Sequence, residues 1–254
     1  MISYLQAILL GIIQGITEWL PVSSSGHLVL LQQYFKLDVP VAFDVILHVG
    51  TLIVIFLVFG KDILAIFKSL LSWQWDQNTK LLLFIILASI PTGIIGLVFH
   101  DWLIGLFSSI LAVGIALLFT GTIVYLSKFS VSNKKLTWWK SVVIGVVQGL
   151  AIIPGISRSG STISFGLFMG VNRKQIAKFS FLLSVPAILG AAILEGKDLV
   201  LVNIGPMIIG TLTSVIVGYF ALKYLLGLIK QGKFYYFSYY CWALGLVVLA
   251  LALR

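Results

Sequence analysis

Six long apolar stretches constrain this chain more than any other feature of its sequence, because about 20 apolar residues in a helix cross the hydrocarbon core of a bilayer. They occupy residues 42–60, 81–99, 104–126, 175–194, 205–226 and 236–253. Hydrophobic residues make up 60% of the 254 residues, charged residues only 10%, and the mean hydropathy is +1.11. This composition excludes an ordinary soluble domain. The sequence therefore predicts an all-α, multi-pass membrane protein.

Charge and cysteine usage exclude further classes of protein. The formal net charge is +9, but the basic residues are scattered between the apolar stretches, so no nucleic-acid partner is expected. The single cysteine, Cys241, can neither form a disulfide within the chain nor contribute to a cysteine-rich metal cluster. The N-terminus lacks the basic region and cleavage site of a signal peptide, so we expect no removable leader.

One motif occurs twice. GIIQGITEWLPVSSSGH at 11–27 is echoed by GVVQGLAIIPGISRSGS at 145–161, with equivalent residues 134 positions apart. The matching pairs are Gly11 and Gly145, Gln14 and Gln148, Gly15 and Gly149, Ser23 and Ser157, Ser25 and Ser159, and Gly26 and Gly160. Such self-similarity indicates two related halves, which we assign to residues 1–126 and 141–254, joined by a basic linker at 127–140.

Each copy of the motif joins two short apolar arms. The arms are residues 5–16 and 28–35 in the first copy and 142–153 and 162–171 in the second. None is long enough to span a bilayer, and lipid permits a non-helical tip between two half-length helices only where protein or water encloses it. The sequence predicts re-entrant hairpins at 5–35 and 142–171, each followed by three spans. The second half is then inverted relative to the first.

The distribution of basic residues predicts an orientation. With both termini outside and both hairpins non-crossing, thirteen lysines and arginines face the cytoplasm and three face outward. The inner residues are Lys61, Lys68, Lys80, Lys128, Lys134, Lys135, Lys140, Arg173, Lys174, Lys178, Lys223, Lys230 and Lys233, and the outer ones are Lys36, Lys197 and Arg254. The first hairpin would enter from outside and the second from the cytoplasm, so that their tips meet near the midplane.

Polar residues at the first tip are candidates for function. Glu18 lies one turn after Gln14 on the same helix face, and a carboxylate inside a membrane is costly, which favours a functional role. Gln14 and Gln148 are expected to support the hairpins by hydrogen bonding, with ligand contact as the alternative.

The stretch that follows Pro21 combines hydroxyl groups, a glycine and a histidine. Ser23 and Ser25 suit helix capping and substrate contact equally, since a Ser/Gly-rich turn at a helix N-terminus points backbone N–H groups at one spot and suits a phosphate. His27 shares this stretch with Ser24 and Gly26 and lies near Glu18. We therefore favour proton or phosphoryl transfer for His27 over a structural role.

Arg158 occupies the position equivalent to Ser24 and is the lone arginine or lysine in the two tips. Its counter-charge must come from Glu18, from a substrate, or from both, and a guanidinium suits bidentate phosphate binding. The alternative is a purely structural pair with Glu18. Asp44 and His48 lie four residues apart on the first span, where a local Asp–His hydrogen bond and direct participation both remain open.

These motifs, with FDVILHVGT between them, resemble the undecaprenyl-diphosphate phosphatase family, which is linked to bacitracin resistance, over nearly the whole chain. The resemblance implies removal of one phosphate from a polyprenyl diphosphate, which recycles the carrier lipid. It implies a catalytic set and a group of residues around the diphosphate. The catalytic set is Glu18, Ser24, His27 and Arg158, and the surrounding residues are Ser23, Ser25, Gly26, Ser157, Ser159 and Gly160.

The resemblance also implies a divalent cation, Mg²⁺ or Ca²⁺, with Glu18 as its protein ligand. Many members place a glutamate where this chain has Gln14, so one carboxylate is missing here.

The sequence thus predicts an integral phosphatase of the plasma membrane whose active site opens to the outer side. Its partners would be a polyprenyl diphosphate and the bilayer, and a homodimer is left open. Ser24 is the first choice for nucleophile, with His27 or Glu18 as its base; attack by His27 itself, or by a water that Glu18 activates, remains open. A lipid-phosphate flippase or secondary transporter is the second hypothesis, because transporters also use inverted repeats, and a scaffold is the third.

Overall fold

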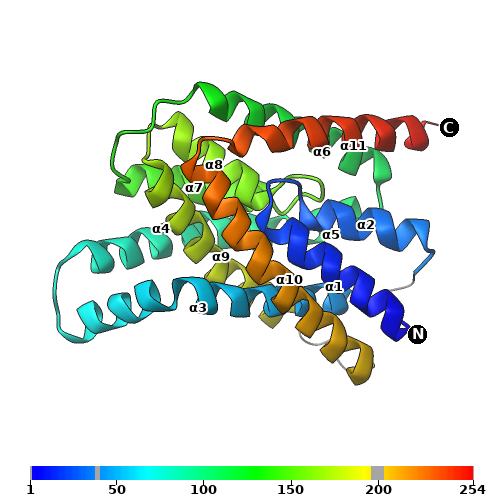
Figure 1. Ribbon diagram of the computed structural model, residues 1–254, viewed down its shortest axis with the longest axis horizontal. Helices are drawn as coiled ribbons and strands as arrows, with labels where there is room; N and C mark the ends of the chain where they lie inside the picture. The colour runs from blue at the N-terminus through cyan, green and yellow to red at the C-terminus, as the bar shows by residue number, and fades with distance from the viewer. Residues whose placement is uncertain (1, 38–40, 196–202, 254) are drawn as a thin grey trace.

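The structure, a computed structural model, describes residues 2–37, 41–195 and 203–253 (Figure 1). These residues form α1 (Tyr4–Trp19), α2 (Ser24–Tyr34), α3 (Val41–Leu71), α4 (Gln77–Val98), α5 (His100–Leu106), α6 (Ile110–Leu126), η1 (Ser127–Phe129), α7 (Trp138–Leu150), α8 (Arg158–Phe168), α9 (Arg173–Glu195), α10 (Ile204–Lys230), η3 (Phe234–Tyr236) and α11 (Phe237–Ala252). Six helices in this described part are long and apolar enough to cross a membrane: α3, α4, α6, α9, α10 and α11. The all-α prediction and the number of spans are confirmed. Two of the predicted outer charges, Lys197 and Arg254, lie outside the described residues.

Several predicted boundaries were wrong. The third span begins at Ile110 instead of 104, because the Ser109 hydroxyl accepts the N–H of Ala112 and caps α6, while the residues before it form the separate helix α5. The helix of the first span continues beyond residue 60 to Leu71, with non-helical backbone angles at Phe59.

The polar tips are also shorter than the predicted arms allowed. Between the two helices of each hairpin, only residues 20–23 and 151–157 are non-helical. The stretch from Ser24 to His27 therefore forms the first turn of α2.

The two copies of the motif fold alike. Helices α1 and α7 begin 134 positions apart, as do α2 and α8, and α2 and α8 also end 134 positions apart. Each copy is therefore a helical hairpin with nearly the same local structure.

Small residues let each hairpin pack closely on a long helix from the other half of the chain. Helix α1 packs on α10, and a Cβ atom added to Gly11 would lie 2.4 Å from the carbonyl oxygen of Gly210. Helix α7 packs on α4, where a Cβ atom on Gly145 would lie 2.1 Å from the carbonyl oxygen of Ala88. Glycine allows these backbones to approach, as is typical of helix pairs in membranes. The two halves therefore interlock.

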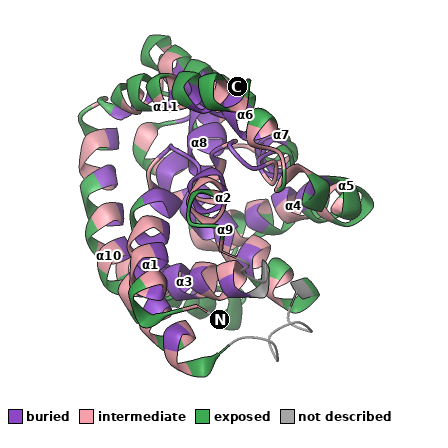
Figure 2. Ribbon diagram, turned by 90° about the vertical axis from the view of Figure 1, so that its right-hand side faces the viewer, coloured by how far each residue is buried: buried purple, intermediate pink, exposed green. Residues whose placement is uncertain are grey.

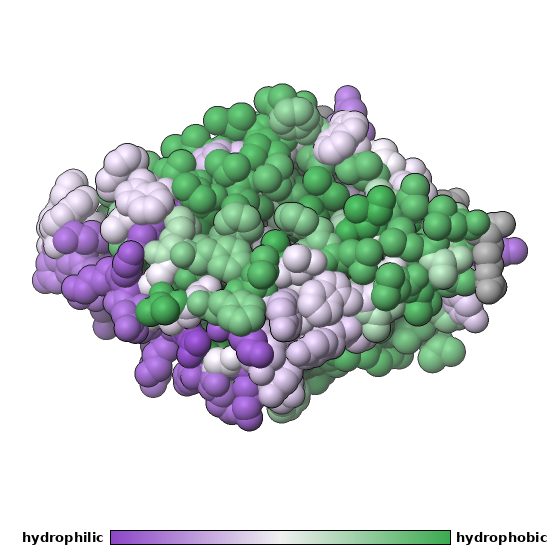
Figure 3. All heavy atoms as spheres, turned by 90° about the horizontal axis from the view of Figure 1, so that it is seen from above, coloured by the Kyte–Doolittle hydropathy of each residue, from purple (hydrophilic) through white to green (hydrophobic). Residues whose placement is uncertain are grey.

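The helices surround a buried centre. Buried residues gather around α2, α8 and the turns beside them, while the outer sides of α4, α10 and α11 are largely exposed (Figure 2). The start of α1 and the end of α11 lie at one end of the molecule, and the turn between α3 and α4 lies at the other (Figure 1). Hydrophilic side chains gather toward the second end, and most of the remaining visible surface is apolar (Figure 3). This distribution suits a protein whose sides face lipid.

Candidate active site

The turns of the two hairpins meet at the buried centre. The Ser23 hydroxyl accepts the backbone N–H of Gly155 at 3.1 Å. A Cβ atom on Gly26 would lie 3.0 Å from Gly155 Cα, and one on Gly160 would lie 3.1 Å from Pro21 Cβ. These contacts are reciprocal, because Pro21 and Gly155 are 134 positions apart, as are Gly26 and Gly160. The tips therefore touch each other through equivalent positions.

Each tip begins its second helix with the same cap. The Ser23 hydroxyl accepts the N–H of Gly26 at 3.3 Å and lies 3.3 Å from the hydroxyl of Ser25. In the second hairpin the Ser157 hydroxyl accepts the N–H of Gly160 at 3.1 Å and lies 3.3 Å from that of Ser159. The capping alternative is thus confirmed for Ser23 and for its equivalent, Ser157. Ser23 adopts a φ of 67°, a left-handed conformation that is costly outside glycine.

Glu18, near the end of α1, is the centre of the polar network. Its Oε2 accepts a hydrogen bond from the Ser24 hydroxyl at 2.8 Å and one from the Gln14 amide at 3.1 Å. Its Oε1 accepts one from Nη2 of Arg158 at 2.5 Å, across the interface between the two hairpins. The Glu18 side chain is only 6% exposed, so these donors take the place of water around the charge.

Arg158 begins α8 and supplies the cation at this site. Its side chain is 15% exposed, and its guanidinium lies 5.9 Å from the centre of the Trp19 ring. While Nη2 bonds to Glu18, Nη1 is buried without a hydrogen-bond partner. A planar guanidinium has donors for two acceptors side by side, so Arg158 can hold Glu18 and retain donors for a second anion.

His48 joins the network from α3. Its Nε2 lies 3.3 Å from Oε2 of Glu18, and its Nδ1 lies 2.7 Å from the backbone carbonyl oxygen of Asp44. A carbonyl oxygen only accepts, so Nδ1 carries a hydrogen atom and the local bond uses the Asp44 backbone instead of its carboxylate. The carboxylate of Asp44 accepts two bonds from the Gln32 amide, at 2.8 and 2.9 Å.

His27 lies apart from this network, although the motif had placed it in the reaction. Its Nδ1 lies 2.7 Å from the carbonyl oxygen of Ser23, and its Nε2 lies 2.7 Å from the hydroxyl of Tyr240 on α11. The two rings stack with 8° between their planes. His27 is not among the residues that line the cavity beside Glu18.

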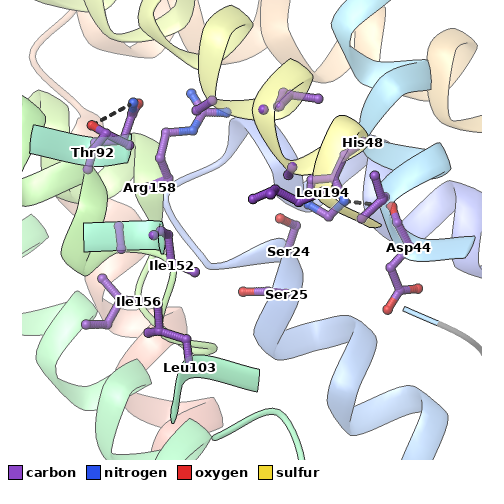
Figure 4. A pocket seen from close by; sticks show the side chains of 18 of the residues that line it. Ser24, Ser25, Asp44, His48, Thr92, Leu103, Ile152, Ile156, Arg158 and Leu194 are labelled. Carbon is purple, nitrogen blue, oxygen red and sulfur yellow. Dashed lines mark hydrogen bonds between the residues drawn. The ribbon is translucent and has the colours of Figure 1, made fainter. Parts of the chain in front are cut away.

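A cavity of about 560 Å³ lies next to Glu18 (Figure 4). Most of the predicted site residues line it: Glu18, Ser23, Ser24, Ser25, Asp44, His48, Gln148, Ser157 and Arg158. Besides His27, four predicted residues do not: Gln14, Gly26, Ser159 and Gly160. Gln14 lies behind Glu18, and the other three belong to the packed tips. Gln148 reaches the Thr92 hydroxyl and the Leu183 carbonyl oxygen, each at 3.4 Å, as expected of a supporting residue.

The side chains around Glu18 could supply only a small part of the ligand shell of a divalent cation, so water and substrate oxygens would have to complete it. Mg²⁺ and Ca²⁺ need about six or more oxygen ligands. Both Glu18 oxygens already accept hydrogen bonds, and Gln14 turns an amide donor toward them. Of the oxygen atoms of these two side chains, only the amide oxygen of Gln14 is left without a hydrogen-bond partner. The described residues contain no group of three or more His, Cys, Asp or Glu that could hold a metal ion.

Comparison with known proteins agrees with the motifs. A profile of the family described as bacitracin resistance protein BacA matches residues 7–247. The chain belongs to the BacA family. An undecaprenyl-diphosphatase from Alkaliphilus metalliredigens is 45% identical and aligns with 98% of this chain and 98% of its own length. One from Carboxydothermus hydrogenoformans is 46% identical and aligns with 97% of this chain and 96% of its own length. These matches confirm the family resemblance noted in the sequence. They also confirm the prediction of a multi-pass membrane protein.

The structure shows further residues that hold the two tips and that no sequence motif indicated. The Thr120 hydroxyl donates to the carbonyl oxygen of Gly155 at 2.9 Å and accepts the N–H of Ser157 at 3.0 Å. On the other tip, the Cys241 thiol donates to the carbonyl oxygen of Pro21 at 3.3 Å. Spans α6 and α11 therefore each hold one tip. No local sequence signal marks these residues, because each lies in the middle of an apolar stretch.

Proposed function

We propose that this chain hydrolyses undecaprenyl diphosphate to the monophosphate and inorganic phosphate. The observation that carries the proposal is the meeting of Glu18, Ser24 and Arg158, from two hairpins, at the polar end of a largely apolar cavity. A hydroxyl bonded to a carboxylate beside a cation with a free donor suits phosphoryl transfer from a lipid. The names of the family's curated relatives support the same reaction.

In this proposal Ser24 is the nucleophile and Glu18 its base. The Ser24 hydroxyl passes its proton to Glu18 Oε2, 2.8 Å away, as its oxygen forms a bond to the terminal phosphorus. The bond from that phosphorus to the bridging oxygen breaks, and undecaprenyl monophosphate leaves. Water then attacks the phosphoserine and releases inorganic phosphate, which restores the Ser24 hydroxyl. Attack by a water that Glu18 activates is the alternative that the same contacts allow.

Charge accumulates on the transferring phosphoryl oxygens, so fixed donors that face them lower the barrier. Arg158 Nη1 is such a donor, and the N–H groups at the start of α2 and α8 add positive ends of helix dipoles. His48 Nε2 lies 3.3 Å from Glu18 Oε2, so His48 would hold this carboxylate in place as the proton moves.

His27 takes a different part in this proposal from the one its sequence context favoured. Its ring binds the carbonyl oxygen of Ser23, the residue directly before the nucleophile, and is anchored by Tyr240. His27 would thus act as a positioning residue that fixes the backbone at Ser24.

We further propose that the two hairpins are re-entrant and that the halves are inverted repeats with both termini outside. The equal spacing of the helix boundaries, the reciprocal tip contacts and the basic residues near the α3–α4 turn support this topology. Accessibility labelling of Ser3→Cys and Ser132→Cys tests it, because the two positions should react from opposite sides of the membrane. Labelling of both from the same side would overturn the inverted arrangement.

Phosphate release from undecaprenyl diphosphate by the purified protein, with and without EDTA, tests the reaction. Ser24→Ala should abolish release, whereas Ser89→Ala should retain it, because the Ser89 hydroxyl lines the cavity but donates to the carbonyl oxygen of Ile85 in its own helix. No release under any cation condition, together with transport of the lipid phosphate in liposomes, would favour a transporter instead.

A further inference from the structure

The cavity extends beyond its charged end into an apolar limb. This limb lies between α4, α5, α9 and the turn between α7 and α8, and Figure 4 shows Leu103, Ile152 and Ile156 on the side of the cavity opposite Asp44 and His48. Apart from His100 at its outer end, this limb is lined mainly by apolar side chains, and the hydroxyls of Ser89 and Thr92 donate to backbone carbonyl oxygens. Such a lining suits a different part of the ligand from the diphosphate.

The apolar limb reaches the outer surface of the helices. Leu97 of α4, Ile104 of α5 and Ile193 of α9 all line the cavity, and yet they are 63%, 40% and 78% exposed. A cavity whose lining residues also lie on an apolar surface is open at that side. We call the gap bordered by these three residues the lateral opening.

Two glycines widen the limb just inside the lateral opening. Gly93 on α4 and Gly190 on α9 line the cavity, and a Cβ atom on either would meet nothing within 4 Å. At Gly11 and Gly145, by contrast, close helix packing requires glycine. Since no neighbour packs on Gly93 or Gly190, what glycine provides there is free volume inside the cavity.

The size of the cavity limits what can fill this volume. At about 560 Å³ it is in the range that buries a drug-sized ligand. It can therefore hold a diphosphate and the first isoprene units but not a long polyprenyl tail. The remaining tail must leave through a side that faces lipid, and the lateral opening is apolar and joined to the charged end.

We propose that the lateral opening admits the first isoprene units of the lipid substrate, and that Gly93 and Gly190 determine how bulky a tail the enzyme accepts. This inference rests on the proposed function. The methyl branches of an isoprene chain make it wider than a straight acyl chain, and the space left by the two glycines accommodates that width.

Leucine substitutions at the two glycines test the inference. Gly93→Leu and Gly190→Leu should fill the limb and raise KM for a long-chain polyprenyl diphosphate about tenfold, as an overpacked site would. For isopentenyl diphosphate, which has a single isoprene unit, KM should rise by a much smaller factor. Gly227→Leu on α10 is the matched control, because its Cβ would also meet nothing within 4 Å but Gly227 does not line the cavity. It should leave both substrates unaffected.

Each outcome separates the two hypotheses. If the wild-type protein hydrolyses neither substrate, the proposed function fails before the variants are compared. If it hydrolyses both and the leucine variants lose the same factor on each, or lose nothing on the long substrate, the tail does not pass these glycines. Size-exclusion profiles and thermal unfolding of every variant show whether it is folded, and the double variant Gly93→Ala/Gly190→Ala gives a milder obstruction that should produce a smaller rise in KM.

Discussion

Replacing Arg158 removes the cation at the charged end of the cavity and separates a catalytic role from a structural one. The side chains of Glu18 and Arg158 are 6% and 15% exposed, so neither charge can turn to bulk water when its partner is lost. Breaking a buried pair from one side typically costs about 3–5 kcal/mol of stability. Arg158→Ala leaves the Glu18 carboxylate unpaired, and Glu18→Gln leaves the Arg158 guanidinium unpaired. Each variant should therefore lower the stability of the protein.

The effect on the reaction is of similar size but has a different cause. A fixed donor to a developing anion contributes about 3–4 kcal/mol to the barrier, so its loss should slow turnover by about 10²–10³. Arg158→Lys keeps the charge but loses the planar pair of donors, so it should fold nearly as well as the wild type and still lose much of the activity.

The double variant Arg158→Ala/Glu18→Gln distinguishes the two effects. It removes both charges together, so its thermal unfolding should recover toward the wild type, as expected for coupled residues, while phosphate release stays low. Rates of phosphate release and unfolding temperatures in the same detergent would be measured for the wild type and the four variants. A double variant that hydrolysed undecaprenyl diphosphate at nearly the wild-type rate would refute the catalytic roles of both residues.

The ion pair between Lys178 of α9 and Asp62 of α3 provides a control. Neither residue lines the cavity, and their side chains are 33% and 37% exposed. Removing both with Lys178→Ala/Asp62→Ala should change stability by about 1 kcal/mol or less and leave turnover unchanged. A large loss of turnover in this control would mean that turnover is lost when an ion pair between two helices is removed, even outside the cavity. The loss in the Arg158 variants would then not indicate a catalytic role.

Three further substitutions test the packing, the metal and the turn between α3 and α4. Gly145→Ala would place a Cβ atom 2.1 Å from the carbonyl oxygen of Ala88, so it should lower the unfolding temperature, while Gly105→Ala, which meets nothing within 4 Å, should not. Gln14→Glu adds a carboxylate beside Glu18, so it should tighten the apparent Mg²⁺ or Ca²⁺ dependence without abolishing turnover, and an unchanged metal titration would count against this position. Hydrogen bonds from Thr79 and neighbouring groups hold the pKa of Asp76 below its ordinary value, so its stabilisation is present at neutral pH and is lost as pH falls through that lowered pKa. Asp76→Asn should therefore flatten the pH dependence of unfolding below about pH 4, and parallel curves for the two proteins would contradict this.

Hydropathy and self-similarity predicted most of the fold because both depend on local sequence. Six spans follow from apolar stretches alone, and the repeat around Gln14 and Gln148 located both hairpins. The third span was wrong at its start because residues 104–126 are continuously apolar, and only the cap at Ser109 separates α5 from α6.

The site was harder to predict because helix faces depend on distant partners. The motif brings His27 close to Glu18 along the chain, but α2 begins at Ser24, and this turns His27 toward Tyr240, 213 positions away. His48 reaches Glu18 only because α3 packs beside α1. The spacing of Asp44 and His48 correctly suggested a local bond, but spacing could not show that the backbone of Asp44, and not its carboxylate, accepts it.

The two hairpins share one backbone design and differ at the position that matters for the proposed reaction. The same serine cap, at Ser23 and Ser157, fixes the first turn of each second helix. The next residue is Ser24 in one hairpin and Arg158 in the other, and both bond to the same carboxylate of Glu18. One hairpin thus presents the proposed nucleophile and the other a cation, and their reciprocal contact brings the two together. Neither half contains both groups, so an active site of this kind requires the interlocked pair, and a separated half would retain a hairpin without its counter-charge.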